Sequence, residues 1–118
     1  MKKYNIGFIG SGKMAGAIIK GLLKSDFVSA ENILATQVEL DGITEKKAAL
    51  GVEIILDNKV LVQKSDIIFI AVKPSQVEGV LAEIESLITS EKLIVSIAAG
   101  IKLRKVSSPY KSWLPIKK

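Results

Sequence analysis

The sequence predicts an α/β protein built on a doubly wound parallel sheet, and two observations carry that prediction. Short apolar runs rich in Ile and Val alternate with helical patterns five times between residues 6 and 97. A glycine-rich stretch, residues 10–12, separates the first apolar run from the first helical pattern. The chain has 118 residues, of which 48% are apolar and 25% charged, as expected for one globular domain.

Five segments are expected to form strands: residues 6–9, 33–37, 52–56, 67–72 and 93–97. The fourth segment is apolar at every position, which is typical of a central parallel strand buried on both faces. Parallel strands that follow one another need crossover connections, and these are right-handed. The order of the segments therefore favours a sheet with helices on both sides.

Helices are expected over residues 13–24, over 41–50, and from Pro74 through an apolar stripe that ends at Ile88. In the second helix, Lys46 and Lys47 are predicted to be exposed, and Gly51 should end the helix. In the first helix, five residues at helical spacing are predicted to form the buried face: Met14, Ala17, Ile18, Gly21 and Leu22.

Residues 102–118 differ in texture from the rest of the chain. They hold six basic residues, no acid and two of the three prolines, and they follow neither a helical nor a strand period. We therefore predict one domain over residues 1–101 and a basic, irregular tail over 102–118. The net charge of +5 comes from this tail, since the first 101 residues are nearly neutral. The tail is expected to be solvated, with no nucleic-acid partner.

The absence of two residue types restricts the chemistry. The chain has no cysteine and no histidine, which excludes thiolate nucleophiles, Ser-His-Asp chemistry and cysteine- or histidine-based metal sites within it. We assign no catalytic residue and no metal ligand. Glycines and Lys13 interrupt the N-terminal apolar run, and other apolar runs are too short to cross a bilayer. A cytoplasmic location without a membrane partner is expected.

The glycine-rich stretch has the form of a dinucleotide-binding turn. Gly10, Gly12 and Ala15 match the pattern G-x-G-x-x-A, in which the first glycine allows a tight turn and the second leaves room for a pyrophosphate. The alanine lets the helix approach the strand. Because the pattern follows a predicted strand and opens a predicted helix, we interpret the domain as a Rossmann-type, NAD(P)-binding fold.

The end of the second predicted strand bears on the choice of cofactor. NAD-binding domains place an acid there to accept hydrogen bonds from the ribose hydroxyls. This chain has Thr36 and Gln37 and no acid until Glu39. Thr36 and Gln37 could donate hydrogen bonds to a 2′-phosphate, so NADP(H) is predicted to be preferred and NAD(H) remains possible. In the alternative interpretation, both residues are simply a polar strand end.

Four segments in order, GFIGSGKMAGAIIKGLL, DN, SDIIFIAVKP and VSIAAGI, resemble pyrroline-5-carboxylate reductase. That enzyme reduces a cyclic imine with NAD(P)H in the last step of proline synthesis. The resemblance covers about residues 4–101 and implies that Ser11, Lys13 and Met14 lie along the pyrophosphate and toward the nicotinamide. It also implies that Thr36 and Gln37 meet the adenosine ribose and its phosphate.

The resemblance assigns the remaining contacts to three places. Asn58 would bind the adenosine side, although a turn-forming role is an alternative. Ala99 would lie near the nicotinamide carboxamide. The nicotinamide itself would be lined, largely by backbone, by Ala71, Val72, Lys73 and Pro74. For Lys73, a solvated charge at a helix start is an equal alternative.

The chain departs from the family after residue 101. In the family a further helix, a strand and a helical domain follow, and that domain supplies the pocket for the small-molecule substrate and the contacts of the homo-oligomer. Residues 105–118 do not match that continuation. The ending of this chain resembles a chain cut short or a changed reading frame. We therefore expect the chain alone to bind cofactor without reducing the imine. A fragment of a β-hydroxyacid or deazaflavin-linked dehydrogenase, and a non-catalytic nucleotide-binding module, are the alternatives.

Overall fold

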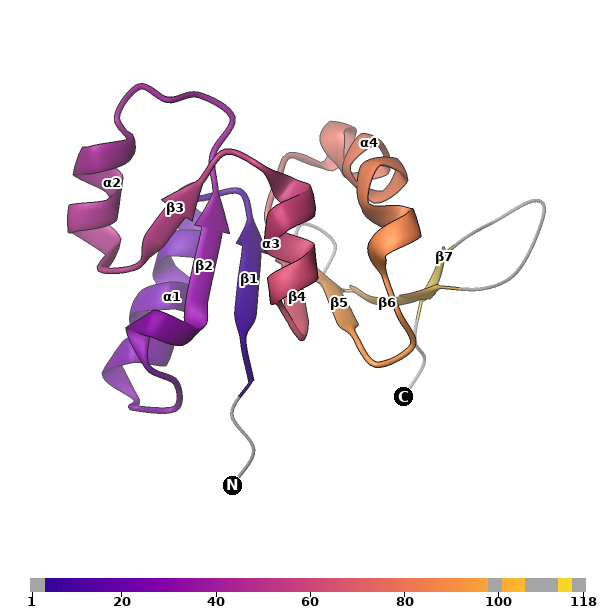
Figure 1. Ribbon diagram of the computed structural model, residues 1–118, viewed down its shortest axis with the longest axis horizontal. Helices are drawn as coiled ribbons and strands as arrows, with labels where there is room; N and C mark the ends of the chain where they lie inside the picture. The colour runs from indigo at the N-terminus through magenta and orange to yellow at the C-terminus, as the bar shows by residue number, and fades with distance from the viewer. Residues whose placement is uncertain (1–3, 98–100, 106–112, 116–118) are drawn as a thin grey trace.

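The computed structural model describes residues 4–97, 101–105 and 113–115, the last two ranges by their backbone only. Its described strands form one sheet in the order β3-β2-β1-β4-β5-β6-β7 (Figure 1). Neighbours among the first five strands are all parallel. This confirms the predicted doubly wound α/β fold. The bounds are β1 (Ile6–Ile9), β2 (Ile33–Thr36), β3 (Glu53–Ile55), β4 (Ile67–Ile70), β5 (Leu93–Ser96), β6 (Ile101–Lys105) and β7 (Trp113–Pro115).

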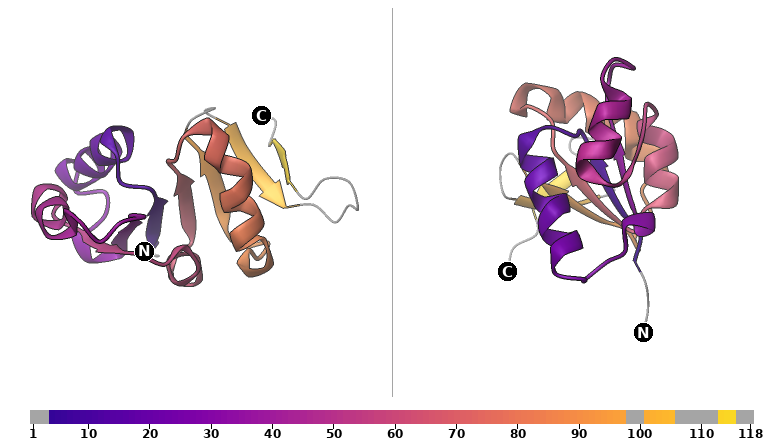
Figure 2. Two further views of the ribbon diagram at one scale, coloured as in Figure 1. Left: turned by 90° about the horizontal axis from the view of Figure 1, so that it is seen from above. Right: turned by 90° about the vertical axis from the view of Figure 1, so that its left-hand side faces the viewer.

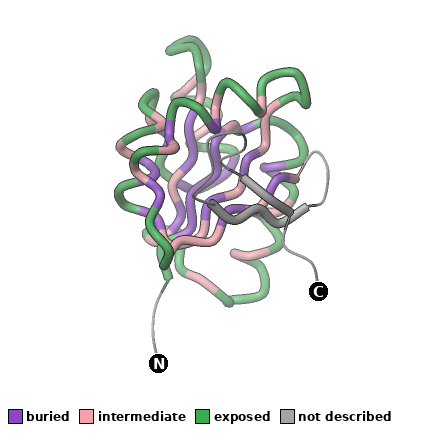
Figure 3. The backbone as a smooth tube through the Cα atoms, turned by 90° about the vertical axis from the view of Figure 1, so that its right-hand side faces the viewer, coloured by how far each residue is buried: buried purple, intermediate pink, exposed green. Residues whose placement is uncertain are grey.

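Helices cover both faces of the sheet. One face carries α1 (Lys13–Lys24) and α2 (Ile43–Leu50), and the other carries α3 (Asn58–Lys64) and α4 (Pro74–Ile84) (Figure 2). The short 3₁₀ helices η1 (Ala30–Asn32) and η2 (Glu85–Leu87) precede β2 and follow α4. Two apolar cores result, one on each side of the sheet. The strands between them carry much of the buried backbone (Figure 3). None of the helices in the described ranges is long and apolar enough to cross a membrane.

The centre of the sheet is tightly packed. Phe8 of β1 and Phe69 of β4 are register partners whose rings stack 4.8 Å apart. On the opposite face, Leu61 and Ser65 of the α3 region press so closely on Gly7 that no side chain would fit there. The Ser65 hydroxyl donates to the Leu61 carbonyl at 2.7 Å, which satisfies that buried group.

The sequence patterns did not predict α3. Local contacts at its two ends explain why this helix forms. Asp57 precedes the helix, and its carboxylate accepts hydrogen bonds from the backbone N–H groups of Lys59 and Val60. This side-chain cap satisfies donors that the first helical turn leaves unpaired. At the other end, the Lys92 ammonium donates to the carbonyls of Val62 and Ser65. Both ends of a seven-residue helix are therefore held.

The buried face of α1 is not the predicted one. Met14, Ala17 and Gly21 are exposed, and the buried residues are Ala15, Gly16 and Ile19, with Ile18 and Leu22 partly buried. The small residues explain the difference. A side-chain carbon at Gly16 would lie 3.2 Å from Leu50, so α1 approaches the domain through its smallest side chains.

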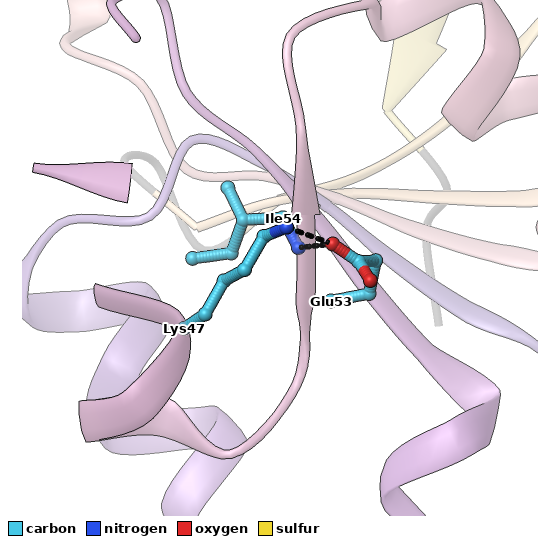
Figure 4. A network of polar contacts seen from close by, with 3 residues as sticks. All are labelled: Lys47, Glu53 and Ile54. Carbon is cyan, nitrogen blue, oxygen red and sulfur yellow. Dashed lines mark hydrogen bonds and ion pairs between the residues drawn. The ribbon is translucent and has the colours of Figure 1, made fainter. Parts of the chain in front are cut away.

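The two lysines of α2 are half-buried, which corrects the prediction that both are exposed. Lys47 forms an ion pair with Glu53 of β3, and the same carboxylate accepts a hydrogen bond from the Ile54 backbone N–H (Figure 4). The hydrogen bond from Lys47, the one from Ile54 and the nearby positive charge hold the pKa of Glu53 below its usual value. This contact joins α2 to β3.

The β4 strand is buried more fully on one face than on the other. Ile68 and Ile70 are buried beneath α3 and α4, whereas Ile67 and Phe69 are only partly buried. The prediction of burial on both faces is therefore correct for one face only. Among the described elements, no helix lies over this part of the sheet on the α1 side (Figure 2).

Residues 101–105 and 113–115 are strands, which differs from the irregular tail that the sequence predicts. β6 pairs antiparallel with β5, and β7 pairs antiparallel with β6. The free edge of β5 offers unpaired backbone donors and acceptors, and β6 satisfies them. Because β6 begins at Ile101, the predicted boundary after that residue falls inside a strand that belongs to the sheet.

Candidate functional site

The candidate site lies at the carboxyl ends of the parallel strands, where the strand order reverses. β1 lies between β2 and β4 in the sheet. The connection from β1 leads to β2 on one side, and the connection from β3 crosses back to β4 on the other side. Open α/β sheets bind ligands in the crevice at such a point. Gly10 and Ala71 directly follow β1 and β4, and their backbones lie close together at this point.

Gly10 is required by the backbone. Its φ is 103°, and a side-chain carbon would lie 2.6 Å from the Ala71 carbonyl oxygen. The Ala71 N–H donates to the Ile9 carbonyl at 2.8 Å, which brings the two chain segments together. The Gly10 N–H donates to the buried Thr36 hydroxyl oxygen at 3.2 Å. Thr36 thus joins the end of β2 to the turn.

Gly12 begins α1, and the space beside it is open. A side-chain carbon at Gly12 would meet no atom within 4 Å. No side chain caps this end of α1, in contrast to α3 with its Asp57 cap. The first N–H groups of α1 are therefore available to an external acceptor, and the helix dipole favours an anion there.

Two predicted residues of the turn are buried. Ala15 is 1% exposed and packs in the core beneath α1, which agrees with a role in helix-to-strand packing. Ser11 is 8% exposed, and its carbonyl accepts a hydrogen bond from the Lys46 ammonium at 3.0 Å. Lys13 and Met14 are exposed at the start of the helix.

A first cavity of about 270 Å³ opens beside Gly10. It contains five predicted residues: Gly10, Thr36, Gln37, Asn58 and Val72. Sequence reasoning missed five others: Ile9, Val38, Leu56, Gln76 and Val80. Val38 is 90% exposed and Leu56 49% exposed. Val38 lies two residues after β2 and Leu56 directly after β3, so apolar residues just beyond these strand ends were the sequence signal for this wall of the cavity.

Two predicted polar residues at this cavity already have protein partners. The Gln37 amide nitrogen donates to the carbonyls of Glu39 and Asp41, which holds the loop after β2 in place. The Asn58 amide nitrogen donates to the Glu83 carboxylate at 3.0 Å. The amide oxygens of both residues are not committed by these bonds and are free to accept.

A second cavity of about 400 Å³ opens at the α1 N-terminus. It is lined by Ile97 and by seven predicted residues: Gly12, Lys13, Met14, Ala71, Val72, Lys73 and Pro74. The Lys73 N–H donates to the Gln76 side-chain oxygen at 3.3 Å and fixes the start of α4. Val72 lines both cavities. Ala99 lies outside the described residues.

No group of three or more acidic, histidine or cysteine side chains that could hold a metal occurs in the described part of the chain. The site instead combines two cavities that share Val72 with an uncapped helix N-terminus, which lines the second of them. Such an arrangement suits an elongated ligand with a central anionic group and two flat ends. A dinucleotide has this form, and the residues present fit it: the space beside Gly12 and the free N–H groups match a pyrophosphate.

A family model described as "NADP oxidoreductase coenzyme F420-dependent" matches residues 5–100. The chain belongs to this family. Its matched region contains all the elements that form the two cavities, so the family supports an NAD(P)-binding interpretation of the site. Preference between NAD and NADP does not follow from it.

The similar proteins include the predicted enzyme. A pyrroline-5-carboxylate reductase of Methanosarcina acetivorans is 45% identical over 103 residues, which is 87% of this chain and 38% of that protein. The structure of a pyrroline-5-carboxylate reductase from Coxiella burnetii is similar with a TM-score of 0.73 and 32% identity, over 80% of this chain and 35% of that chain. The predicted resemblance is confirmed.

Two further similar structures contain a dinucleotide. A pyrroline carboxylate reductase of Plasmodium falciparum with NADP bound has a TM-score of 0.68 and 29% identity, over 82% of this chain and 34% of that chain. An imine reductase of Myxococcus stipitatus in complex with NAD⁺ has a TM-score of 0.66 and 27% identity, over 85% and 33%. The chain therefore spans between 33% and 38% of the length of these four proteins.

Proposed function

We propose that this chain is the cofactor-binding domain of a pyrroline-5-carboxylate reductase and binds NAD(P)(H) across the two cavities. The observation that carries the proposal is the uncapped N-terminus of α1 at Gly12, which lines the second cavity, two residues after Gly10, which lines the first. The pyrophosphate would accept hydrogen bonds from the first N–H groups of α1. The adenosine would occupy the first cavity and the nicotinamide the second.

In the adenosine cavity, shape and apolar surface would do most of the binding. Val38 and Leu56 project from two strand ends and offer apolar faces to a flat base. The Asn58 oxygen would accept a hydrogen bond from the adenosine. Thr36 would act mainly by holding the turn through its bond to Gly10, because its side chain is buried.

In the nicotinamide cavity, the chain would orient the ring. Ala71 and Val72 would lie against one face of the nicotinamide, and Lys73 and Pro74 would bound its edge. When bound, the reduced cofactor supplies a hydride, and the full-length relatives by name reduce a pyrroline carboxylate. The reaction in the whole protein would therefore be imine reduction, in the cytoplasm, with the substrate held by residues outside this domain.

NADP(H) is proposed as the preferred cofactor. No acid follows β2 before Glu39, so the position directly after the strand lacks the carboxylate that would accept from the ribose hydroxyls of NAD(H). This preference is independent of the binding proposal and is tested separately in the same experiment.

The experiment is a calorimetric titration of the 118-residue chain with NADPH and with NADH. We expect saturable binding of both at one site per chain, with a smaller dissociation constant for NADPH. Absence of binding at millimolar concentrations of either cofactor would overturn the proposed function. Equal affinities for the two cofactors, or tighter binding of NADH, would contradict the proposed preference for NADP(H) and leave the proposed cofactor-binding function standing.

A further inference from the structure

Lys46 brings a positive charge to the glycine-rich turn from an element that the motif does not include. It lies on the second turn of α2, and its ammonium donates to the Ser11 carbonyl at 3.0 Å across 35 residues of sequence. The residue is half-buried, so its position is restrained by packing as well as by this bond. A lysine ammonium has three N–H donors, and the bond to Ser11 uses one.

The Lys46 side chain also lines a third cavity of about 400 Å³, beside the loop that follows β2. Gln37 and Val38 line both this cavity and the adenosine cavity, so the two are neighbours. Glu39, Asp41 and Gly42 complete the wall. Lys46 is the one basic residue among those that line either of these two cavities.

The neighbouring charges are arranged differently. Lys47 faces away, toward β3, and is paired with Glu53 (Figure 4). No carboxylate of the described side chains forms an ion pair with Lys46. Glu39 and Asp41 are exposed residues of the loop after β2. Water screens their carboxylate charges, and their side chains can turn away from the cavity. The ammonium of Lys46, held by its bond to the Ser11 carbonyl, is therefore the best-fixed positive charge beside this cavity.

We propose that Lys46 binds the 2′-phosphate of NADP(H) and so sets the preference for this cofactor over NAD(H), which rests on the proposed function. The 2′-phosphate is the group that distinguishes the two cofactors, and a free ribose hydroxyl carries no charge for an ammonium to attract. Gln37, the residue expected at this position, has its amide nitrogen bonded to the carbonyls of Glu39 and Asp41. Lys46 supplies the donor that Gln37 does not.

The test compares Lys46→Gln with Lys47→Gln in calorimetric titrations. Glutamine removes the charge and can still donate to the Ser11 carbonyl, and Lys47 is the matched control one residue away. The affinities for NADPH and NADH give the cofactor preference of each variant. The affinities for adenosine 2′,5′-bisphosphate and for 5′-AMP, which lacks the 2′-phosphate, show whether the effect lies at that phosphate. Lys46→Arg keeps the charge, and urea denaturation of each variant establishes that it is folded.

Lys46→Gln is expected to raise the dissociation constants of NADPH and the bisphosphate by about tenfold, the scale of one charge-assisted contact. The dissociation constants of NADH and 5′-AMP should change by less than about twofold. Lys47→Gln and Lys46→Arg should retain the preference. Equal weakening of both cofactors would assign Lys46 to support of the turn and overturn the proposal, as would unchanged NADPH binding. If the unchanged chain bound neither cofactor, the proposed function itself would fail first.

Discussion

At the residue scale, the two glycines of the turn have different physical reasons to be glycine. Gly12 has an extended backbone that any residue can adopt and open space beside it. Gly12→Val should therefore leave the fold intact and place a branched side chain where the pyrophosphate would lie. We expect the NADPH dissociation constant to rise at least about a hundredfold with an unchanged urea midpoint. Unchanged affinity would mean that the turn has only a structural role.

Gly10 should behave in the opposite way. Gly10→Ala puts a side-chain carbon 2.6 Å from the Ala71 carbonyl oxygen at a φ of 103°. Both effects destabilise the folded state, by about 2 kcal/mol or more in total. Urea denaturation measures this cost, and Gly12→Ala serves as the control, with an expected change within about 0.5 kcal/mol. A Gly10→Ala variant as stable as the control would contradict the structure of the turn.

Residue types and spacing named residues that line the two cavities, but not the contacts among them. Gly10 lines the first cavity and Gly12 the second, because the pattern reports backbone geometry directly, and their part in binding a dinucleotide stays a prediction. The roles of Thr36 and Gln37 could not be foreseen, since their partners Gly10, Glu39 and Asp41 are brought to them by the turn and the loop. Lys46 was missed for the same reason: its contact with Ser11 depends on how α2 packs.

At the element scale, the five parallel strands could be predicted from the sequence, and α3 could not. The parallel strands are apolar runs, and their periodicity survives in the sequence as a strong signal. The seven residues of α3 are too few to show a helical period, and the helix depends on its cap and on packing against β1. β6 and β7 were also missed, because pairing with a free sheet edge leaves no periodic pattern in a short basic segment.

The dependence of α3 on its cap can be measured. Asp57→Ala removes the acceptor for two backbone N–H groups and should lower the free energy of unfolding by about 1 kcal/mol. Asp57→Asn keeps an acceptor oxygen and should retain most of the stability. The readout is the urea midpoint at constant m-value. Equal midpoints for Asp57→Ala and the unchanged chain would show that α3 is held by packing alone.

At the scale of the whole molecule, the proposed function gives this chain the cofactor side of a reaction centre. It spans 38% of its Methanosarcina acetivorans relative, and the nicotinamide cavity is lined by residues that can hold one partner of the reaction. Hydride transfer needs donor and acceptor held together, and such positioning can supply roughly 7–11 kcal/mol of the barrier.

We therefore predict that the purified 118-residue chain binds NADPH but reduces pyrroline-5-carboxylate at least about 10⁵-fold more slowly than a full enzyme. A steady-state assay that follows NADPH absorbance, with a full-length pyrroline-5-carboxylate reductase as the positive control, measures this. Turnover near one per second would show that this chain completes a substrate pocket by itself.

The central claim is that a dinucleotide binds at the carboxyl edge of the parallel sheet, and amide chemical shifts measured during an NADPH titration test it most directly. The account predicts that the largest shifts fall on Gly10, Gly12, Lys13 and Met14 and on the 71–73 segment, which line the two cavities. The opposite edge, at Ala30–Asn32 and residues 89–92, should change little. Shifts confined to that opposite edge, or none at saturating NADPH, would contradict the account.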